Sequence, residues 1–335
     1  MKNKHIPPII FFYKGIFPSY AYDSLKINRK NVSNKIILLC DISKIDKKRI
    51  EKNIILYDYN KFNEELKDIK FPNKKIKSFR SRFWIRTIER YLIINSFCKF
   101  YKINKFYHVE LDNLINDLSM LHKRLDKYKN KIFFSVVGSL GFGSFVYINS
   151  LKVFENFCFF SKNTIKKIFK NDMQLLYLFS KKYKSQTKHL PTIENYFDNG
   201  KNNAVSPVEA GGIFDSLHIG SYLFGQDPRN HCYFISSLKK HYQTNNTYNI
   251  LQKFKYNFTS KNYYATFKEN HIKIFNIHVH SKLIKKIFFK NKYKQIIKKA
   301  NLKLPTIIDY NILNILKLFF SDFRFSRFKK LLEQI

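Results

Sequence analysis

Residues 35–41, Lys-Ile-Ile-Leu-Leu-Cys-Asp, form a continuous apolar run that ends in an acid. Such a run suits a parallel strand that is covered on both faces. Comparable apolar runs lie on either side of it, at 6–13 and 53–58, and the segments between them, 23–30 and 44–52, have the character of short helices. The first 60 residues therefore alternate strand and helix, which predicts a doubly wound α/β fold with a mixed, mostly parallel sheet flanked by helices.

The rest of the chain continues this pattern. The strongest helical signal spans 79–101, where apolar residues recur at roughly 3.6-residue spacing without Gly or Pro, and it leads directly into a strand at 105–110. Further elements are expected as strands at 131–137, 145–148 and 272–281, a glycine turn at 138–143, helices at 151–160 and 171–182, a long loop at 184–212, and helices from 282 onward.

Two acids follow the strand at 105–110. Glu110 and Asp112 are spaced i, i+2, so on an extended backbone their side chains share a face. At the carboxyl end of a strand in an open α/β sheet, that face lines the crevice where ligands bind. Two carboxylates there suit Mg²⁺ or Mn²⁺, which also bridges to the oxygens of a diphosphate. The alternative is a solvated junction in which Asp112 caps a helix.

The charge of the chain is strongly positive. The formal net charge is +38 over 335 residues, but only ten of the 62 basic residues are Arg. Arg is preferred for bidentate recognition of phosphates and bases, whereas an excess of Lys, Asn and Ile is typical of an AT-rich coding sequence. Most of the charge is therefore assigned to solvated faces, and the rest to attraction for anionic ligands or an anionic membrane surface. Nucleic-acid binding is unlikely and is kept as the rival hypothesis.

The spacing of the cysteines and the hydropathy of the chain limit the cellular compartments that fit this sequence. Cys40, Cys98, Cys158 and Cys232 lie far apart and form no C-x-x-C pair, so neither a zinc knuckle nor a disulfide framework is indicated. The chain shows no secretory apolar region at its start and no run of 18 uncharged apolar residues. These features predict a cytoplasmic protein that does not span a membrane.

Five segments together resemble a known family. They are the opening Ile-Pro-Pro-Ile-Ile at 6–10, Phe-Trp-Ile-Arg-Thr-Ile-Glu-Arg-Tyr at 83–91, His-Val-Glu-Leu-Asp at 108–112, the Phe-Asp to Asp-Pro-Arg-Asn segment at 214–230, and Asn-Ile-His-Val-His-Ser-Lys at 276–282. The sequence resembles the metal-dependent nucleotide-sugar glycosyltransferases of the GT-A fold, and most closely a group found in bacterial polysaccharide clusters and large viruses.

The resemblance covers roughly residues 6–290. It implies a GT-A-like, Rossmann-like catalytic domain over 1–290, followed by a basic, aromatic-rich helical extension over 291–335. The usual triplet of the family is Asp-x-Asp, so Glu110 departs from it, although Glu is also an oxygen ligand. The resemblance implies that Glu110 and Asp112 bind Mn²⁺ or Mg²⁺ and that His278 or His280 supplies a third ligand. The alternative for the histidines is a strand pair with ordinary hydrogen bonds.

The resemblance also implies a donor site at the ends of the first three strands. Phe12 and Tyr13 end the first strand and are expected to hold the nucleotide base by stacking. Asp41 or Asp58, at the ends of the next two strands, is expected to bind the ribose by hydrogen bonds.

Catalytic groups are expected in the segment at 214–230. Asp215 and Asp227 are the candidate bases for the acceptor hydroxyl, and Arg229 is a candidate for fixed positive charge at the leaving diphosphate. Asp-Pro-Arg-Asn is also good turn chemistry, which is the structural alternative. Arg90 is expected to lie at the donor site. Glu89 and Arg90 form either an ion pair that supports the site or an ordinary helix face.

The implied function is hexose transfer from a UDP- or GDP-sugar to a glycan or lipid-linked acceptor in cell-surface polysaccharide or lipopolysaccharide synthesis. A degenerate transferase fold that only binds glycan is a further alternative. The tail at 313–335 mixes aromatic and basic residues, which suits a peripheral contact with the inner face of a membrane or, alternatively, two helices packed on the catalytic domain.

Overall fold

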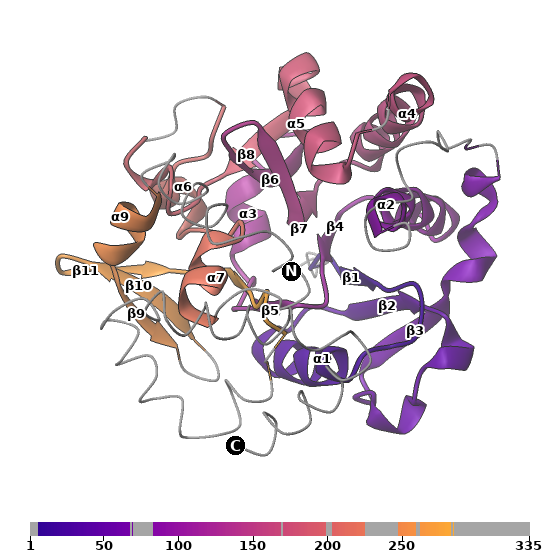
Figure 1. The fold of residues 1–335 in the computed structure, drawn as a ribbon, viewed down its shortest axis with the longest axis horizontal. Coiled ribbons are helices and arrows are strands. Elements are labelled where there is room, and N and C mark those ends of the chain that lie inside the picture. The colour runs from indigo at the N-terminus through magenta and orange to yellow at the C-terminus, as the bar shows by residue number, and fades with distance from the viewer. Residues whose placement is uncertain are drawn as a thin grey trace, which may run out of the picture.

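A seven-stranded sheet forms the centre of the protein (Figure 1). The computed structural model describes residues 6–67, 69, 83–168, 170–198, 203–224, 247–258, 262–282 and 284. The strand order is β3-β2-β1-β4-β7-β6-β8. The strands are β1 (Ile9–Phe12), β2 (Ile36–Cys40), β3 (Ile54–Asp58), β4 (Phe106–Val109), β6 (Ile132–Val137), β7 (Leu140–Ile148) and β8 (Thr187–Leu190).

Every strand of this sheet except β7 runs in the same direction. β1 pairs in parallel with β2 and β4, β2 with β3, and β6 with β8, whereas β7 is antiparallel to both β4 and β6. The carboxyl ends of six strands therefore meet along one edge of the sheet. The predicted mixed, mostly parallel sheet flanked by helices is confirmed.

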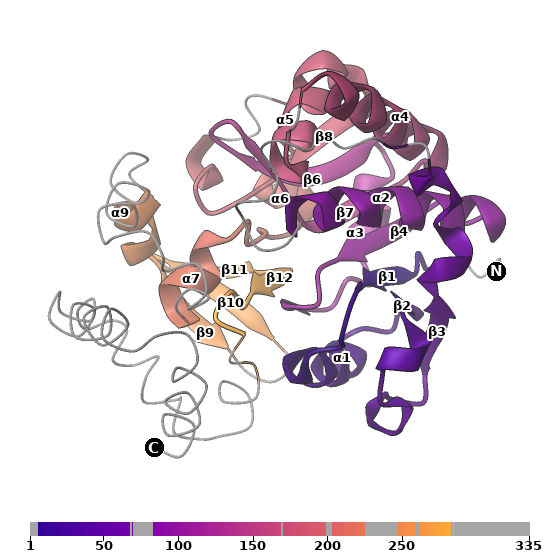
Figure 2. The ribbon, with the colours of Figure 1, turned by 45° about the vertical axis from the view of Figure 1, so that its right-hand side comes forward.

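Helices cover both faces of the sheet (Figure 2). One buried cluster joins the sheet to α1 (Ser19–Asn31) and α3 (Leu121–Leu125). The other joins its opposite face to α2 (Phe83–Phe100), α4 (Leu151–Lys167) and α5 (Asp172–Lys182). Because neighbouring residues of a strand point to opposite faces, Phe11 belongs to the first cluster and Ile10 to the second.

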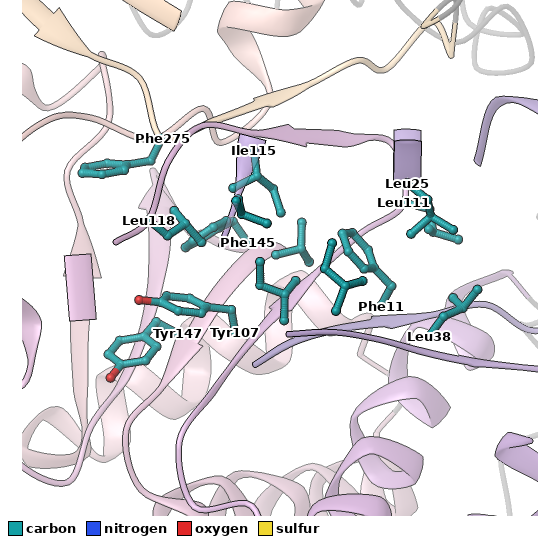
Figure 3. Close-up of a cluster of buried hydrophobic side chains, with 14 of the residues drawn as sticks. Phe11, Leu25, Leu38, Tyr107, Leu111, Ile115, Leu118, Phe145, Tyr147 and Phe275 are labelled. Atoms are coloured by element: carbon teal, nitrogen blue, oxygen red, sulfur yellow. The ribbon is translucent and has the colours of Figure 1, made fainter. Parts of the chain in front are cut away.

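Large aromatic side chains fill the first cluster, part of which is shown in Figure 3. The rings of Tyr107 and Tyr147 stack with their centroids 4.6 Å apart, and Phe214 stacks on Phe275 at 4.8 Å. Each fully buried side chain of this size contributes about 1.5–3 kcal/mol to folding. Phe275 comes from a segment that follows the sheet by more than 80 residues, so this cluster also anchors the later part of the chain.

A smaller part of the protein lies beside the sheet and has its own apolar cluster. It contains the two-stranded pair β5 (Asn113–Ile115) and β12 (Asn276–His278), together with a three-stranded sheet. Its other elements are α7 (His218–Phe224), α9 (Thr247–Gln252), β9 (Lys255–Phe258), β10 (Tyr263–Phe267) and β11 (Asn270–Lys273). The short helix α6 (Pro207–Ala210) instead packs on α3 and belongs to the first cluster.

The predicted helix at 44–52 is wrong. The chain there forms two short 3-10 turns, η1 (Ile42–Lys44) and η2 (Lys47–Arg49). The carboxylate of Asp41 accepts from the backbone N–H of Ser43, and that of Asp46 accepts from the N–H of Lys48. Such local bonds compete with helix formation, and these two turns bury no side chain that could compensate.

Three other expectations need correction. The predicted glycine turn at 138–143 is shorter, because β7 already begins at Leu140. The segment 184–212 is not one loop, because it contains the edge strand β8 and the helix α6, which begins with a capping box between Ser206 and Glu209. The segment 272–281 is not one strand. Between β11 and β12 the segment pairs with Ile213, whose N–H donates to the carbonyl of Lys273 and whose carbonyl accepts from the N–H of Phe275. The chain therefore changes its pairing partner between β11 and β12.

Several predicted features lie outside the described residues. Asp227, Arg229 and the extension at 291–335 belong to this group. Within the described part, Cys40, Cys98 and Cys158 are buried and no disulfide joins them. None of the helices described is both long enough and apolar enough to cross a bilayer.

Candidate metal centre

Three side chains of metal-binding type meet just beyond the carboxyl end of β4. Glu110, Asp112 and His278 each offer a ligand atom, and these atoms all lie within 4.8 Å of one another. Nε2 of His278 is 3.2 Å from Oδ2 of Asp112 and 3.8 Å from Oε2 of Glu110. The structure therefore brings together the two acids and one of the two histidines that the sequence singled out.

The pairing of β5 with β12 explains why these residues meet. β5 begins directly after Asp112, and its first residue, Asn113, lies opposite His278 in the antiparallel register. The N–H of Val279 donates to the carbonyl of Asp112 at 2.8 Å, and the amide of Asn276 donates to Oδ1 of Asn113 at 2.7 Å. These bonds hold the histidine strand against the acidic segment, although the two are more than 160 residues apart in sequence.

The other histidine, His280, takes a different position. Its ring centroid is 5.6 Å from that of His278, and its N–H donates to the carbonyl of His278 at 2.8 Å. The set of three converging ligand atoms in the described residues does not include it. β12 ends at His278, so the regular alternation that would put both rings on one face stops there.

Asp215 supports His278 through hydrogen bonds to backbone N–H groups. Its Oδ1 accepts from the N–H of Ile219 at 3.0 Å, and its Oδ2 accepts from the N–H groups of Gly220 at 2.8 Å and His278 at 3.0 Å. Burial raises the pKa of Asp215 to about 6, while its bonds to backbone N–H groups act in the opposite direction. The carboxylate thus ties α7 to β12. A Cβ on Gly220 would lie 1.9 Å from the carbonyl oxygen of His278, so only glycine allows this close approach.

Arg90 connects Glu110 to a third acid. Its Nη1 donates to Oε1 of Glu110, and its Nη2 donates to Oδ2 of Asp172 at 2.7 Å and to the hydroxyl of Tyr91 at 3.0 Å. Burial disfavours the ionised form of Glu110, but the Arg90 guanidinium holds the pKa of that carboxyl below its usual range. Burial raises the pKa of Asp172, although Arg90 opposes the shift. Arg90 therefore fixes the orientation of Glu110.

Lys282 makes the corresponding contact with Asp112. Its ammonium donates to Oδ2, the same oxygen that faces His278. Burial opposes ionisation of Asp112, yet Lys282 and His278 together hold the pKa of its carboxyl well below the usual range. Each of the two acids thus pairs with its own cationic side chain.

The three ligand groups fit a divalent ion. Atoms that each lie about 2.1 Å from one ion are about 3 Å apart when they subtend a right angle, close to the separations seen between His278 and the two acids. Two carboxylate oxygens suit Mg²⁺ and Mn²⁺ alike, whereas the imidazole nitrogen favours a first-row transition ion and hence Mn²⁺. Nδ1 of His278 is buried and no protein group in the described structure bonds to it.

The expected ribose-binding acids lie at the same edge of the sheet. Asp41 follows β2 directly, Asp58 is the last residue of β3, and the two strands are neighbours. Asp41 accepts from the hydroxyl of Ser43 at 2.6 Å and pairs with Lys44 at 2.6 Å, and the Lys44 bond lowers the pKa of Asp41. Asp58 accepts from the backbone and side chain of Asn60. Both carboxylates thus cap short turns, and each lies at the end of the strand where the sequence predicted it.

The expected base-binding rings also lie at this edge. Phe12 meets Tyr59 edge to face with 5.6 Å between centroids, and Tyr13 meets Phe17 in the same manner at 5.5 Å. Both rings are partly exposed at the end of β1. The two aromatic residues therefore lie at the end of β1, between β4 and the strands β2 and β3 that carry the two acids.

Sequence reasoning missed a buried charged pair near this site. Nδ1 of His218 faces Oε1 of Glu194, and their side chains are 2% and 9% exposed. The hydroxyl of Ser216 lies 3.3 Å from the same Nδ1. In a Ser-His-acid relay the serine and the acid use different ring nitrogens, so this arrangement is not a nucleophilic triad. Burial opposes the charged forms, but each partner favours the other, so the pKa of Glu194 is lowered and that of His218 is raised.

This pair should give the protein a pH-dependent stability. A raised folded-state pKa means that the contribution of His218 is complete below its ordinary value of 6.5 and is lost as pH rises through the folded value. The lowered pKa of Glu194 means that its contribution is present above 4.5 and is lost in acid. Urea unfolding of Glu194→Gln should therefore show a loss of about 2 kcal/mol near pH 6 that shrinks at about pH 4 and pH 9.

Glu155→Gln is the matched control, because Glu155 is 39% exposed and lies 3.8 Å from Lys99. Its effect should be close to zero at every pH. A loss in Glu194→Gln that stays constant across the pH range would show that the pair is not ionised as described.

Comparison with known proteins gives structural similarity alone. No protein-family model matches the sequence, and no curated protein matches it. Mouse xyloside xylosyltransferase 1 in its apo form aligns over 56% of this chain and 86% of its own, with 8% identity and a TM-score of 0.41. The galactosyltransferase LgtC with donor and acceptor sugar analogues aligns over 60% and 81%, with 12% identity and a TM-score of 0.36.

The glycosyltransferase GlyE of Streptococcus pneumoniae aligns over 58% of this chain and 48% of its own, with 16% identity and a TM-score of 0.35. All three are glycosyltransferases by description. Similarity at this level does not assign a function, so the function is inferred from the geometry of the site.

Proposed function

We propose that this protein is a metal-dependent glycosyltransferase that moves a sugar, a hexose in the simplest case, from a nucleoside-diphosphate donor to a glycan or lipid-linked acceptor. The observation that carries this proposal is the convergence of Glu110, Asp112 and His278 beyond the carboxyl end of β4. In sheets of this kind that edge is where ligands bind. Two carboxylates and one imidazole there suit an ion that bridges protein and diphosphate.

The residues of the chain divide the work of the reaction. When the anomeric carbon leaves the diphosphate, negative charge develops on the departing phosphate, and a bound Mn²⁺ or Mg²⁺ would supply Lewis-acid stabilisation there. Glu110, Asp112 and His278 would hold that ion. Arg90 keeps Glu110 in place and, because it is 8% exposed and bonded to two acids, it is a positioning residue rather than a group that meets the phosphate. Asp215 does the same for His278 through its backbone N–H.

The nucleoside is proposed to lie along the ends of β1, β2 and β3. Phe12 and Tyr13 offer aromatic surface for the base, and Asp41 and Asp58 offer carboxylate oxygens for the ribose hydroxyls. All four residues lie at the ends of the consecutive strands β3, β2 and β1, and β1 is the neighbour of β4. This order supports the assignment, because the diphosphate would then extend toward the metal centre. UDP and GDP are the candidate nucleotides.

Further residues are proposed for the acceptor side of the site. Asp227 as a base and Arg229 as an added positive charge remain proposals, and so does a peripheral membrane contact through 291–335. For Asp215 we propose the positioning role in place of the predicted role as a base, because the residue is 2% exposed and both of its carboxylate oxygens accept from backbone N–H groups. Glu194 joins the candidate acids on this side, because it follows β8, whose carboxyl end lies at the same edge as that of β4. Cell-surface polysaccharide synthesis is the proposed setting.

Thermal unfolding with nucleotides tests the proposal. A ligand that binds only the native state raises the melting temperature, and at 100 times its dissociation constant it adds about 2.7 kcal/mol to stability. We expect UDP or GDP with Mn²⁺ to stabilise the protein, and the nucleotide without metal to do so much less. Radiolabelled donor should then release free sugar slowly when water replaces the acceptor.

The rival hypothesis gives a different result. A protein that uses its positive charge to bind nucleic acid should be stabilised by oligonucleotides of any sequence, in a manner that falls steeply with salt and does not need Mn²⁺. Stabilisation of that kind, with no response to any nucleoside diphosphate, would overturn the transferase proposal.

A further inference from the structure

Lys282 occupies a position that a metal ion would need. Its ammonium contacts Oδ2 of Asp112, the oxygen that also faces Nε2 of His278. We propose that Lys282 is a resident counter-ion that holds Asp112 in the metal-free protein and has to leave before a divalent cation binds. The inference rests on the metal-dependent function proposed above and adds a control on when the site accepts its ion.

Geometry makes the two cations mutually exclusive. An ammonium in contact with a carboxylate oxygen lies about 3 Å from it, and a bound divalent ion about 2 Å. Both would have to share one oxygen whose other neighbour is His278, in a place where the Asp112 and Lys282 side chains are only 12% and 18% exposed. Little water is present to screen the repulsion between them.

The balance of charge also favours the departure of Lys282 when a metal ion binds. Three carboxylates, those of Glu110, Asp112 and Asp172, share this network with two cationic side chains, Arg90 and Lys282. With a divalent ion bound, Arg90 and the metal alone neutralise the three acids. Lys282 then becomes a surplus cation at the edge of the site, and an anionic co-ligand such as a diphosphate would give it a new partner.

The backbone around Lys282 lets the side chain exchange partners. The residue has a φ of 61°, and its N–H donates to the carbonyl of Val279 at 2.9 Å, so a tight turn beyond β12 fixes its Cα. The ammonium also lies 5.4 Å from the ring centroid of Tyr20 on α1. The four-carbon stem can therefore move the charge away from Asp112 without any change in the strand that carries His278.

The consequence is a protein that binds metal poorly by itself. Mn²⁺ alone has to displace the Lys282 ammonium, which then loses its carboxylate partner, and this loss weakens binding. When Mn²⁺ binds together with a diphosphate, the diphosphate becomes the new partner of Lys282. Removing the lysine charge should tighten binding of the metal alone and reduce the benefit that the nucleotide adds.

Titration of Mn²⁺ followed by electron paramagnetic resonance of the free ion tests this directly. Wild type, Lys282→Met and Lys282→Arg are titrated with Mn²⁺ alone and again with UDP or GDP. Without nucleotide, Lys282→Met should bind Mn²⁺ at least 10-fold more tightly than wild type, and Lys282→Arg, which keeps the charge, should behave like wild type. Nucleotide should tighten Mn²⁺ binding by wild type far more than by Lys282→Met. Lys127→Met is the control, since Lys127 pairs with Glu209 on the exposed surface.

Each outcome is informative. Equal or weaker binding of Mn²⁺ by Lys282→Met, with the melting temperature of the wild type retained, would overturn the counter-ion role while leaving the transferase proposal intact. Absence of Mn²⁺ binding by wild type both with and without nucleotide would overturn the proposed function, and the inference about Lys282 with it.

Discussion

Replacing Asp112 with Asn is expected to lower sugar transfer by more than about 100-fold, because the variant loses the charged oxygen that lies nearest to His278. The amide keeps the size of the side chain and can still meet the surrounding groups, so the fold should survive. Mn²⁺-dependent stabilisation by a nucleoside diphosphate should disappear along with the activity. Transfer from a labelled donor and thermal unfolding of the same preparation measure the two effects together.

Asp117→Asn provides the matched control for this variant. Asp117 lies five residues further along, is 47% exposed and bonds to Ser119. Its replacement should leave metal-dependent transfer within about twofold of wild type, since surface bonds of this kind contribute little. Retention of full activity by Asp112→Asn would remove the metal centre from the mechanism.

Replacing Arg90 with Met should destabilise the protein by about 3–5 kcal/mol, which is the usual cost of leaving a buried charge without its partner. The guanidinium bonds to Glu110 and Asp172 at once, and the Asp172 side chain is only 5% exposed. Methionine fills part of the space but neutralises neither acid. Urea unfolding at pH 7 measures the loss.

A second substitution separates the charge effect from simple loss of packing. Adding Asp172→Asn to Arg90→Met removes one of the stranded carboxylates and should recover part of the lost stability. The control is Lys99→Met on the same helix, where the lysine is 52% exposed and 3.8 Å from Glu155, so little change is expected. If the double variant were less stable than Arg90→Met alone, the ion-pair explanation would be wrong.

The sheet could be predicted because its strands are buried on both faces. Continuous apolar runs such as Ile36–Cys40 depend only on local sequence, and their alternation with helices fixes a parallel arrangement. The edge strand β8 was missed because its sequence, Thr-Lys-His-Leu, contains a single apolar residue, Leu190, and so shows no apolar run. The break between β11 and β12 was missed because it depends on Ile213, a residue about 60 positions away.

The candidate site was predictable only in part, for a related reason. Glu110 and Asp112 are visible together because they lie two residues apart, directly after the strand β4. The partners of these acids come from remote segments, and nothing local marks Asp172 as the partner of Arg90 or Lys282 as the partner of Asp112. Asp172 carries one weak signal, since it opens a helix directly after the capping residue Asn171. Burial of a charge is a property of the packed chain, so one sequence alone does not reveal it.

The pairing of β5 with β12 affects how the protein folds during its synthesis. Two of the three proposed ligands lie within the first 112 residues, whereas the third arrives at position 278. A ribosome releases the chain from its beginning, so the large sheet can assemble well before the metal centre exists. The newly made protein would therefore be unable to form the proposed metal centre until almost all of the described chain has emerged.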